Sequence, residues 1–120
     1  MVREPLRVAV VGCGAIGRRH ARAAVAAGAR LVGAVDTDPE RAAALCAGSD
    51  ARPHPDLTAL LRATVPDVVT VATPDDAHVA PTLEALAAGC DVFCEKPLAT
   101  RLGDARRMVS AARTAGRRLG

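Results

Sequence analysis

The feature that most constrains the fold is a set of three glycines between an apolar run and a helical stretch. Residues 6–11 form a β-branched run that ends at Gly12, and Gly14, Gly17 and an alanine-rich stretch to about residue 27 follow. Strand, Gly-x-Gly-x-x-Gly and helix together form a dinucleotide-binding turn, whereas the glycines alone recur by chance. The first glycine permits the tight turn, the second lets a pyrophosphate approach the backbone, and the third lets the helix pack against the strand. The free N–H groups and positive dipole end of that helix can then hold a diphosphate.

A second apolar run ends at Asp36, nineteen residues after Gly17. An acid at about this distance accepts hydrogen bonds from the adenosine ribose hydroxyls. The alternative is a turn or helix-capping acid, because Asp-Thr-Asp-Pro is also a good turn sequence. A carboxylate at this place repels a 2′-phosphate, and Asp38 adds to the repulsion. The sequence therefore favours NAD over NADP, while Arg18 and Arg41 keep NADP open.

The rest of the chain alternates strand and helix signals, which is typical of a doubly wound parallel α/β sheet. Apolar runs predict strands at residues 67–72 and 91–94, and the turn-rich residues 48–55 hold at most a short strand. Four further helices are predicted. One covers residues 39–47, one begins after residue 56, one ends at Gly89, and the last runs from residue 100 to about 115. Asp38, Asp56 and Thr100 are the expected N-caps, and Gly116 the expected end of the last helix.

Lys96 is the one lysine among sixteen basic residues. An ammonium gives up its proton when desolvated and acts as a compact point charge, which a guanidinium does not. Lys96 follows the predicted strand at residues 91–94, and ligands of open parallel sheets bind beyond the carboxyl ends of the strands. We therefore interpret it as a functional residue. The alternative is an ordinary solvated surface charge.

Length and composition exclude several classes of protein. A chain of 120 residues fits one domain, residues 1–120, and its core must be built from small aliphatic residues because Phe93 is the only aromatic residue. The net charge of +3 is mild, and the nearest thing to a basic cluster is Arg18, Arg19 and Arg22, so we expect no nucleic-acid partner.

The four cysteines contain no C-x2-C pair, and the spacing of Cys90 and Cys94 is weak evidence for zinc. We therefore expect that the thiols are free, that the protein is cytoplasmic and that it has no metal site. Residues 1–5 lead directly into an apolar run of about six residues, which is too short for a signal peptide or a membrane span.

Five segments of the chain, in order, follow the pattern of one known family. They are residues 12–20, residues 35–42, residues 72–78 with Thr73, Pro74 and His78, then Ala88-Gly89, and residues 94–99 with Glu95-Lys96-Pro97. On these segments the chain resembles the N-terminal nucleotide-binding domain of the Gfo/Idh/MocA oxidoreductases, named after glucose–fructose oxidoreductase, inositol dehydrogenase and rhizopine-catabolism proteins. The resemblance covers nearly the whole chain. The glycine turn is common to many Rossmann domains, whereas Thr-Pro-x-x-x-His followed by Glu-Lys-Pro is much more specific.

The resemblance implies strand order 3-2-1-4-5 and a nicotinamide-dependent oxidoreductase acting on a sugar, cyclitol or related hydroxyl compound. It implies a cis peptide bond between Lys96 and Pro97, and a Lys96 ammonium that lowers the pKa of the reacting hydroxyl and orients it. Residues implied to bind the cofactor are, at the pyrophosphate, Gly12, Gly14, Ala15, Ile16 and Gly17; at the ribose, Asp36 and Thr37; in the cleft, Ala72, Thr73, Pro74 and His78; and at the nicotinamide, Glu95 and Lys96.

His20 and His78 also match family positions. The alternative for each is a histidine at a helix start, hydrogen-bonded to a neighbouring loop. Members of the family continue into a sixth strand and a second α/β domain, which supplies an acid and a histidine one helical turn apart and pairs subunits. We therefore expect an exposed edge on the fifth strand, no activity from this chain alone, and a homo-oligomer only with the second domain.

Two alternatives remain. One is an NAD-binding module or truncated product without catalysis. The other is a different Rossmann reductase, of the dihydrodipicolinate or biliverdin reductase kind, against which Glu95-Lys96-Pro97 argues.

Overall fold

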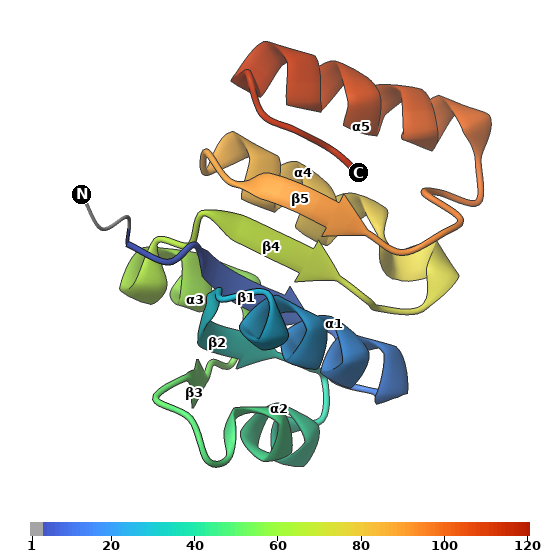
Figure 1. The fold of residues 1–120 in the computed structure, drawn as a ribbon. Helices are drawn as coiled ribbons and strands as arrows, with labels where there is room; N and C mark the ends of the chain where they lie inside the picture. Colours follow the sequence, from blue (N-terminus) through green and yellow to red (C-terminus); the bar gives the residue numbers. More distant parts are fainter. Residues whose placement is uncertain (1–3) are drawn as a thin grey trace.

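The structure is a computed structural model that describes residues 4–120. Residues 1–3 lie outside the described part, so the expectation that no signal peptide precedes the first strand falls partly on them. It contains a single five-stranded parallel sheet with helices on both faces (Figure 1). The strand order β3-β2-β1-β4-β5 confirms the expected doubly wound topology. The strands are β1 (Arg7–Val11), β2 (Arg30–Val35), β3 (Arg52–Pro53), β4 (Val68–Val71) and β5 (Asp91–Cys94).

The helices divide between the two faces of the sheet. Small side chains of α1 and α2, including Ala21 and Ala42, pack with Val10 and Leu31 in one buried cluster. Leucines of α3 and α4, with Met108 of α5, pack on the opposite face. The helices are α1 (Ala15–Ala26), α2 (Pro39–Cys46), α3 (Leu57–Thr64), α4 (Val79–Ala87) and α5 (Leu102–Ala115), with a 3-10 turn η1 (Asp75–Ala77) before α4. No helix in residues 4–120 is long and apolar enough to span a membrane.

Two of the three predicted N-caps are confirmed. Asp38 accepts a hydrogen bond from the amide of Glu40, and Asp56 accepts one from the amide of Ala59. The prediction for Thr100 is wrong, because α5 begins one residue later. Its N-cap is Arg101, in an extended conformation without a side-chain capping bond, so the Thr100 hydroxyl lies outside the first turn.

The edge of β5 is not left open. Three backbone hydrogen bonds join β5 to the last residues of the chain. The Val92 amide donates to the Arg118 carbonyl, the Gly120 amide donates to the Val92 carbonyl, and the Cys94 amide donates to the Gly120 carbonyl. Leu119 forms an isolated parallel bridge with Val92. Figure 1 shows the C-terminus beside β5. The expectation of an exposed edge was therefore wrong for this part of β5, because backbone pairing needs no apolar sequence.

Candidate nucleotide-binding site

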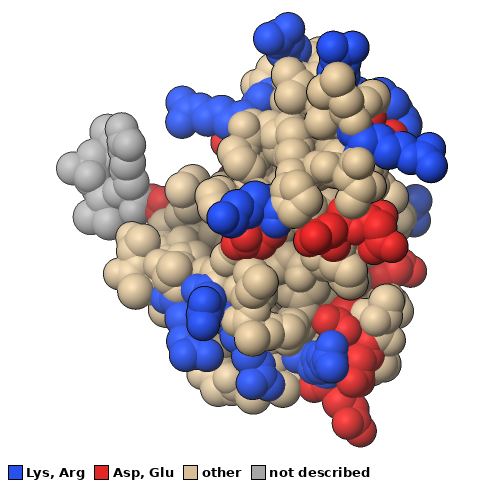
Figure 2. Space-filling model, turned by 90° about the vertical axis from the view of Figure 1, so that its right-hand side faces the viewer, with Lys and Arg blue, Asp and Glu red and all other residues tan. Residues whose placement is uncertain are grey.

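A cavity of about 660 Å³ opens at the carboxyl ends of β1, β2 and β4. Figure 2 shows this face of the molecule, with basic side chains at the top and acidic side chains across the middle and lower right. Nine predicted cofactor residues line the cavity: Gly12, Gly14, Ala15, Ile16, Asp36, Thr37, Ala72, Thr73 and Pro74. The cavity is also lined by Arg41, predicted only as a residue that could admit NADP, and by four residues that were not predicted: Val11, Val35, Asp75 and Ala77.

Sterics at the three glycines explain why the turn needs them. Gly12 has φ +92°, and a Cβ there would lie 2.5 Å from the carbonyl carbon of Ala72. A Cβ on Gly17 would lie 1.8 Å from the carbonyl oxygen of Gly12, so Gly17 lets α1 pack against the turn and does not line the cavity. A Cβ on Gly14 would meet no atom within 4 Å and would occupy the space in front of α1.

The N-terminus of α1 offers an anion site. Gly14 is its N-cap and makes no side-chain capping bond, and no acidic residue lies in the first turn. The first-turn N–H groups have no partner within an α-helix and carry the positive end of the dipole. The backbone in front of them is open, so the residues present fit a diphosphate.

Asp36 is held by two backbone amides. One carboxylate oxygen accepts from the amide of Cys13 at 2.7 Å, and the other accepts from the amide of Asp38 at 2.8 Å. The second bond is the turn interaction that was the alternative for this residue, and the first ties β2 to the glycine turn. A carboxylate has about four lone-pair sites, so both oxygens can still accept bonds from ribose hydroxyls.

The thiol of Cys13 is sealed beneath the turn. Burial, reinforced by the negative charge of Asp36, raises its pKa to about 12. All four cysteines are free, as predicted, and the structure shows that all four are buried. Residues 4–120 contain no group of three or more His, Cys, Asp or Glu side chains that could hold a metal ion.

Glu95, Lys96 and Pro97 follow β5, beside the β4 end of the cavity but outside its lining. The Lys96–Pro97 peptide bond is cis, which confirms the expectation. Lys96 is exposed, and no ion pair among the described residues involves its ammonium. Glu95 pairs with His20 of α1 at 2.7 Å.

His78 joins two loops. Its ring is fully buried, with Nδ1 2.8 Å from the Pro97 carbonyl oxygen and Nε2 2.9 Å from the Thr73 carbonyl oxygen. A side chain without exposed surface does not reach a ligand in the cleft. The predicted direct cofactor contact of His78 is therefore not found in this geometry, and the alternative, a histidine bonded to neighbouring loops, describes it.

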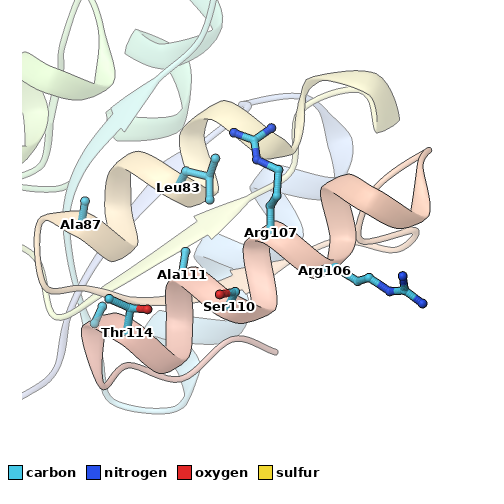
Figure 3. Close-up of a pocket in the computed structure, with 8 residues that line it drawn as sticks. Leu83, Ala87, Arg106, Arg107, Ser110, Ala111 and Thr114 are labelled. Atoms are coloured by element: carbon cyan, nitrogen blue, oxygen red, sulfur yellow. The ribbon is translucent and has the colours of Figure 1, made fainter.

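A second cavity of about 710 Å³ lies between α4 and α5 (Figure 3). Leu83 and Ala111 face each other across it, and Arg106 points away from α4. It contains none of the predicted site residues and lies away from the glycine turn. The candidate nucleotide site is therefore the cavity at the strand ends.

Comparison with known proteins agrees with this geometry. Residues 6–120 match the model of the Gfo/Idh/MocA oxidoreductases, described as an oxidoreductase family with an NAD-binding Rossmann fold. The chain belongs to this family. The cofactor of the family's Rossmann domain is NAD, in agreement with the prediction from Asp36.

The relatives and solved structures that match this chain are all about three times its length. Inositol 2-dehydrogenase 3 of Saccharopolyspora erythraea is 40% identical over 95% of this chain and 34% of its own length. The WlbA dehydrogenase of Bordetella pertussis, solved with NADH and UDP-GlcNAcA, superposes with a TM-score of 0.88 and is 40% identical, over 97% of this chain and 36% of its own. The myo-inositol dehydrogenase of Lactobacillus casei, solved with NAD(H) and myo-inositol, has a TM-score of 0.86 and 37% identity, over 92% of this chain and 34% of its own. The chain thus spans about a third of the length of the relatives it matches.

Proposed function

We propose that this chain is the cofactor-binding part of a dehydrogenase that transfers a hydride between NAD and a hydroxyl group of a sugar or cyclitol. The observation that carries the proposal is the order of groups along the carboxyl edge of the sheet. Asp36 ends β2, the glycine turn ends β1, Thr73 follows β4, and Lys96 follows β5. One dinucleotide can extend along this edge, with its adenosine at Asp36 and its nicotinamide toward Lys96.

Each end has a defined task in this proposal. NAD, when bound, accepts or returns the hydride. Asp36 binds the ribose hydroxyls and disfavours a 2′-phosphate by charge repulsion, which makes NADP the weaker ligand. The Lys96 ammonium donates a hydrogen bond to the reacting oxygen, stabilises the negative charge that develops there and lowers the pKa of the hydroxyl.

The general base is assigned to a part of the enzyme other than these 120 residues. Asp50 and His54 have the spacing of one helical turn, but they lie on either side of β3, at the opposite edge of the sheet from Lys96. We therefore expect the 120-residue chain to bind NAD and not to oxidise a polyol. The relatives named above are sugar and inositol dehydrogenases, which supports a polyhydroxylated substrate.

Calorimetric titration of the 120-residue chain tests the proposal. We expect micromolar NAD+ affinity, weaker binding of NADP+ and no turnover of myo-inositol. Absence of NAD+ binding by a folded sample would remove the nucleotide function, and robust turnover would show that the base lies within these residues. In a protein that joins this domain to a substrate domain, Lys96→Arg should lower kcat about a hundredfold. An unchanged kcat would reduce Lys96 to a surface charge.

A further inference from the structure

The side chains of His20 and Glu95 form a link between α1 and the segment after β5. Nε2 of His20 lies 2.7 Å from a carboxylate oxygen of Glu95, although 75 positions separate the two residues. The contact is only partly accessible, with side-chain exposures of 11% for His20 and 28% for Glu95. A short bond between an imidazole and a carboxylate is one of the stronger hydrogen bonds in proteins.

The imidazole ring is fixed by its surroundings. It packs edge-on against Phe93, with ring centroids 5.3 Å apart. Nδ1 of His20 is buried and has no hydrogen-bond partner among residues 4–120. A nitrogen without an acceptor nearby favours the tautomer in which Nε2 carries the proton and donates it to Glu95.

The link connects the two functional ends of the cleft. The first turn of α1 carries Ala15 and Ile16, which line the cavity, and His20 lies about one turn further along the same helix. Glu95 immediately precedes Lys96. The His20 hydrogen bond is also the main reason that the pKa of Glu95 lies below its ordinary value; the backbone amide and the charge of Lys96 lower it to a smaller extent.

We propose that His20 is a positioning residue for the nicotinamide end of the cleft. It holds the Glu95 carboxylate against α1, so that this carboxylate does not pair with the adjacent Lys96 ammonium. Lys96 then keeps its charge available to the ligand. Without His20, a released Glu95 carboxylate lies next in the chain to the Lys96 ammonium, and an ion pair between them would withdraw the ammonium from the cleft. This inference rests on the proposed function, because it requires a ligand whose nicotinamide half reaches Lys96.

Two ligands that share the adenosine half separate this role from a general structural one. ADP-ribose contains the diphosphate and both riboses but lacks nicotinamide. We expect His20→Leu to weaken NADH binding about fivefold to tenfold, the effect of about one ordinary hydrogen bond, and to change ADP-ribose affinity less than about twofold. Calorimetry measures both affinities on the same samples.

Variants on the same helix and at the partner residue serve as controls. His20→Gln retains a side-chain N–H donor and should restore most of the NADH affinity. Arg22→Leu removes an exposed cation from the same helix and should leave both affinities unchanged. If His20→Leu does not fold, His20→Phe, which keeps a ring and removes the donor, should show the same selective loss. In the double variant His20→Leu, Glu95→Gln no carboxylate is left to capture Lys96, so the selective loss of NADH affinity should be reversed.

The outcomes distinguish the inference from the proposed function. Equal losses of both ligands, or no loss of either, would overturn the positioning role while leaving NAD binding in place. If the wild type binds neither ligand, the proposed function fails and the positioning role fails with it. Long-range 15N NMR of the free chain should show His20 as the Nε2-protonated tautomer with a signal that shifts in Glu95→Gln. A different tautomer would contradict the link itself.

Discussion

The two ends of the cleft are built from different parts of the polypeptide. At the proposed adenosine end, the backbone makes the site: two glycines line it, a third lets α1 approach, and Asp36 is fixed by two amides. At the proposed nicotinamide end, side chains make it: His20 pairs with Glu95, His78 joins the loops after β4 and β5, and Lys96 is exposed.

The two ends should therefore tolerate substitution differently. A site made by the backbone has no rotamer to adjust, so an added methyl group cannot be accommodated where backbone atoms are close. Side-chain sites adjust, so a substitution shifts an affinity or a rate without unfolding the domain. We therefore expect the effects of mutation to grow from the nicotinamide end to the glycine turn.

The largest effect is expected for Gly17→Ala. Its Cβ would lie 1.8 Å from the carbonyl oxygen of Gly12, so α1 must move away from the turn. We expect the free energy of unfolding to fall by about 3 kcal/mol or more and NAD+ binding to be lost. Urea denaturation measures the free energy of unfolding. Gly28→Ala is unsuitable as a control because φ there is +94°; Gly103→Ala in α5, with no atom within 4 Å, is the matched control.

Gly14→Ala should separate binding from folding. The new Cβ meets no protein atom within 4 Å, so the free energy of unfolding should change by only about a few tenths of a kcal/mol. The same methyl group occupies the space in front of α1, so NAD+ affinity should fall about tenfold or more by calorimetry. A variant that binds NAD+ normally would show that the diphosphate does not approach Gly14.

Asp36→Asn should have an intermediate effect on both properties. An amide side chain offers one carbonyl oxygen, so its NH2 group must face either the Cys13 or the Asp38 amide, donor against donor. We expect a loss of about 1–3 kcal/mol of stability and about a tenfold loss of NAD+ affinity. Because the carboxylate charge is gone, NADP+ should lose less affinity than NAD+.

The control for Asp36→Asn is Asp38→Asn, two residues later. Asp38 caps α2, and asparagine is an equally good N-cap, so stability should hardly change. If both variants bind NAD+ alike, the ribose role of Asp36 is wrong and its carboxylate serves only the turn.

Local chemistry made much of this site predictable. The glycines, Asp36 and Glu95-Lys96-Pro97 are each specified by a few neighbouring residues and by the strand that precedes them. The β5 pairing of Arg118 and Gly120 was not predictable, because those residues carry no strand signal.

Contacts between distant segments were also beyond the sequence. Thr100 has capping chemistry, but α5 starts one residue later, with Arg101 as its N-cap. The burial of His78 and the partner of His20 depend on how the sheet order places α1, β4 and β5 side by side. A histidine on α1 and a polar residue after β5 were visible, but no local pattern joins positions 75 residues apart.

The smallest effect concerns the thiol beneath the glycine turn. The pKa of Cys13 is raised from 9.0 to about 12 by burial and then by Asp36, so the native state keeps a proton that the unfolded state loses. The free energy of unfolding should therefore fall as pH rises above about 9, by at most about 1.4 kcal/mol per pH unit for one thiol. Burial also raises the pKa of Cys46, Cys90 and Cys94, so these thiols contribute to the same decline, and comparison of Cys13→Ala with the wild type isolates the part that belongs to Cys13. Urea denaturation between pH 8 and about 10.5 should give a shallower decline for Cys13→Ala than for the wild type. Equal slopes would mean that the turn opens enough to hydrate the thiol, and the backbone end of the cleft would then be less rigid than its sterics indicate.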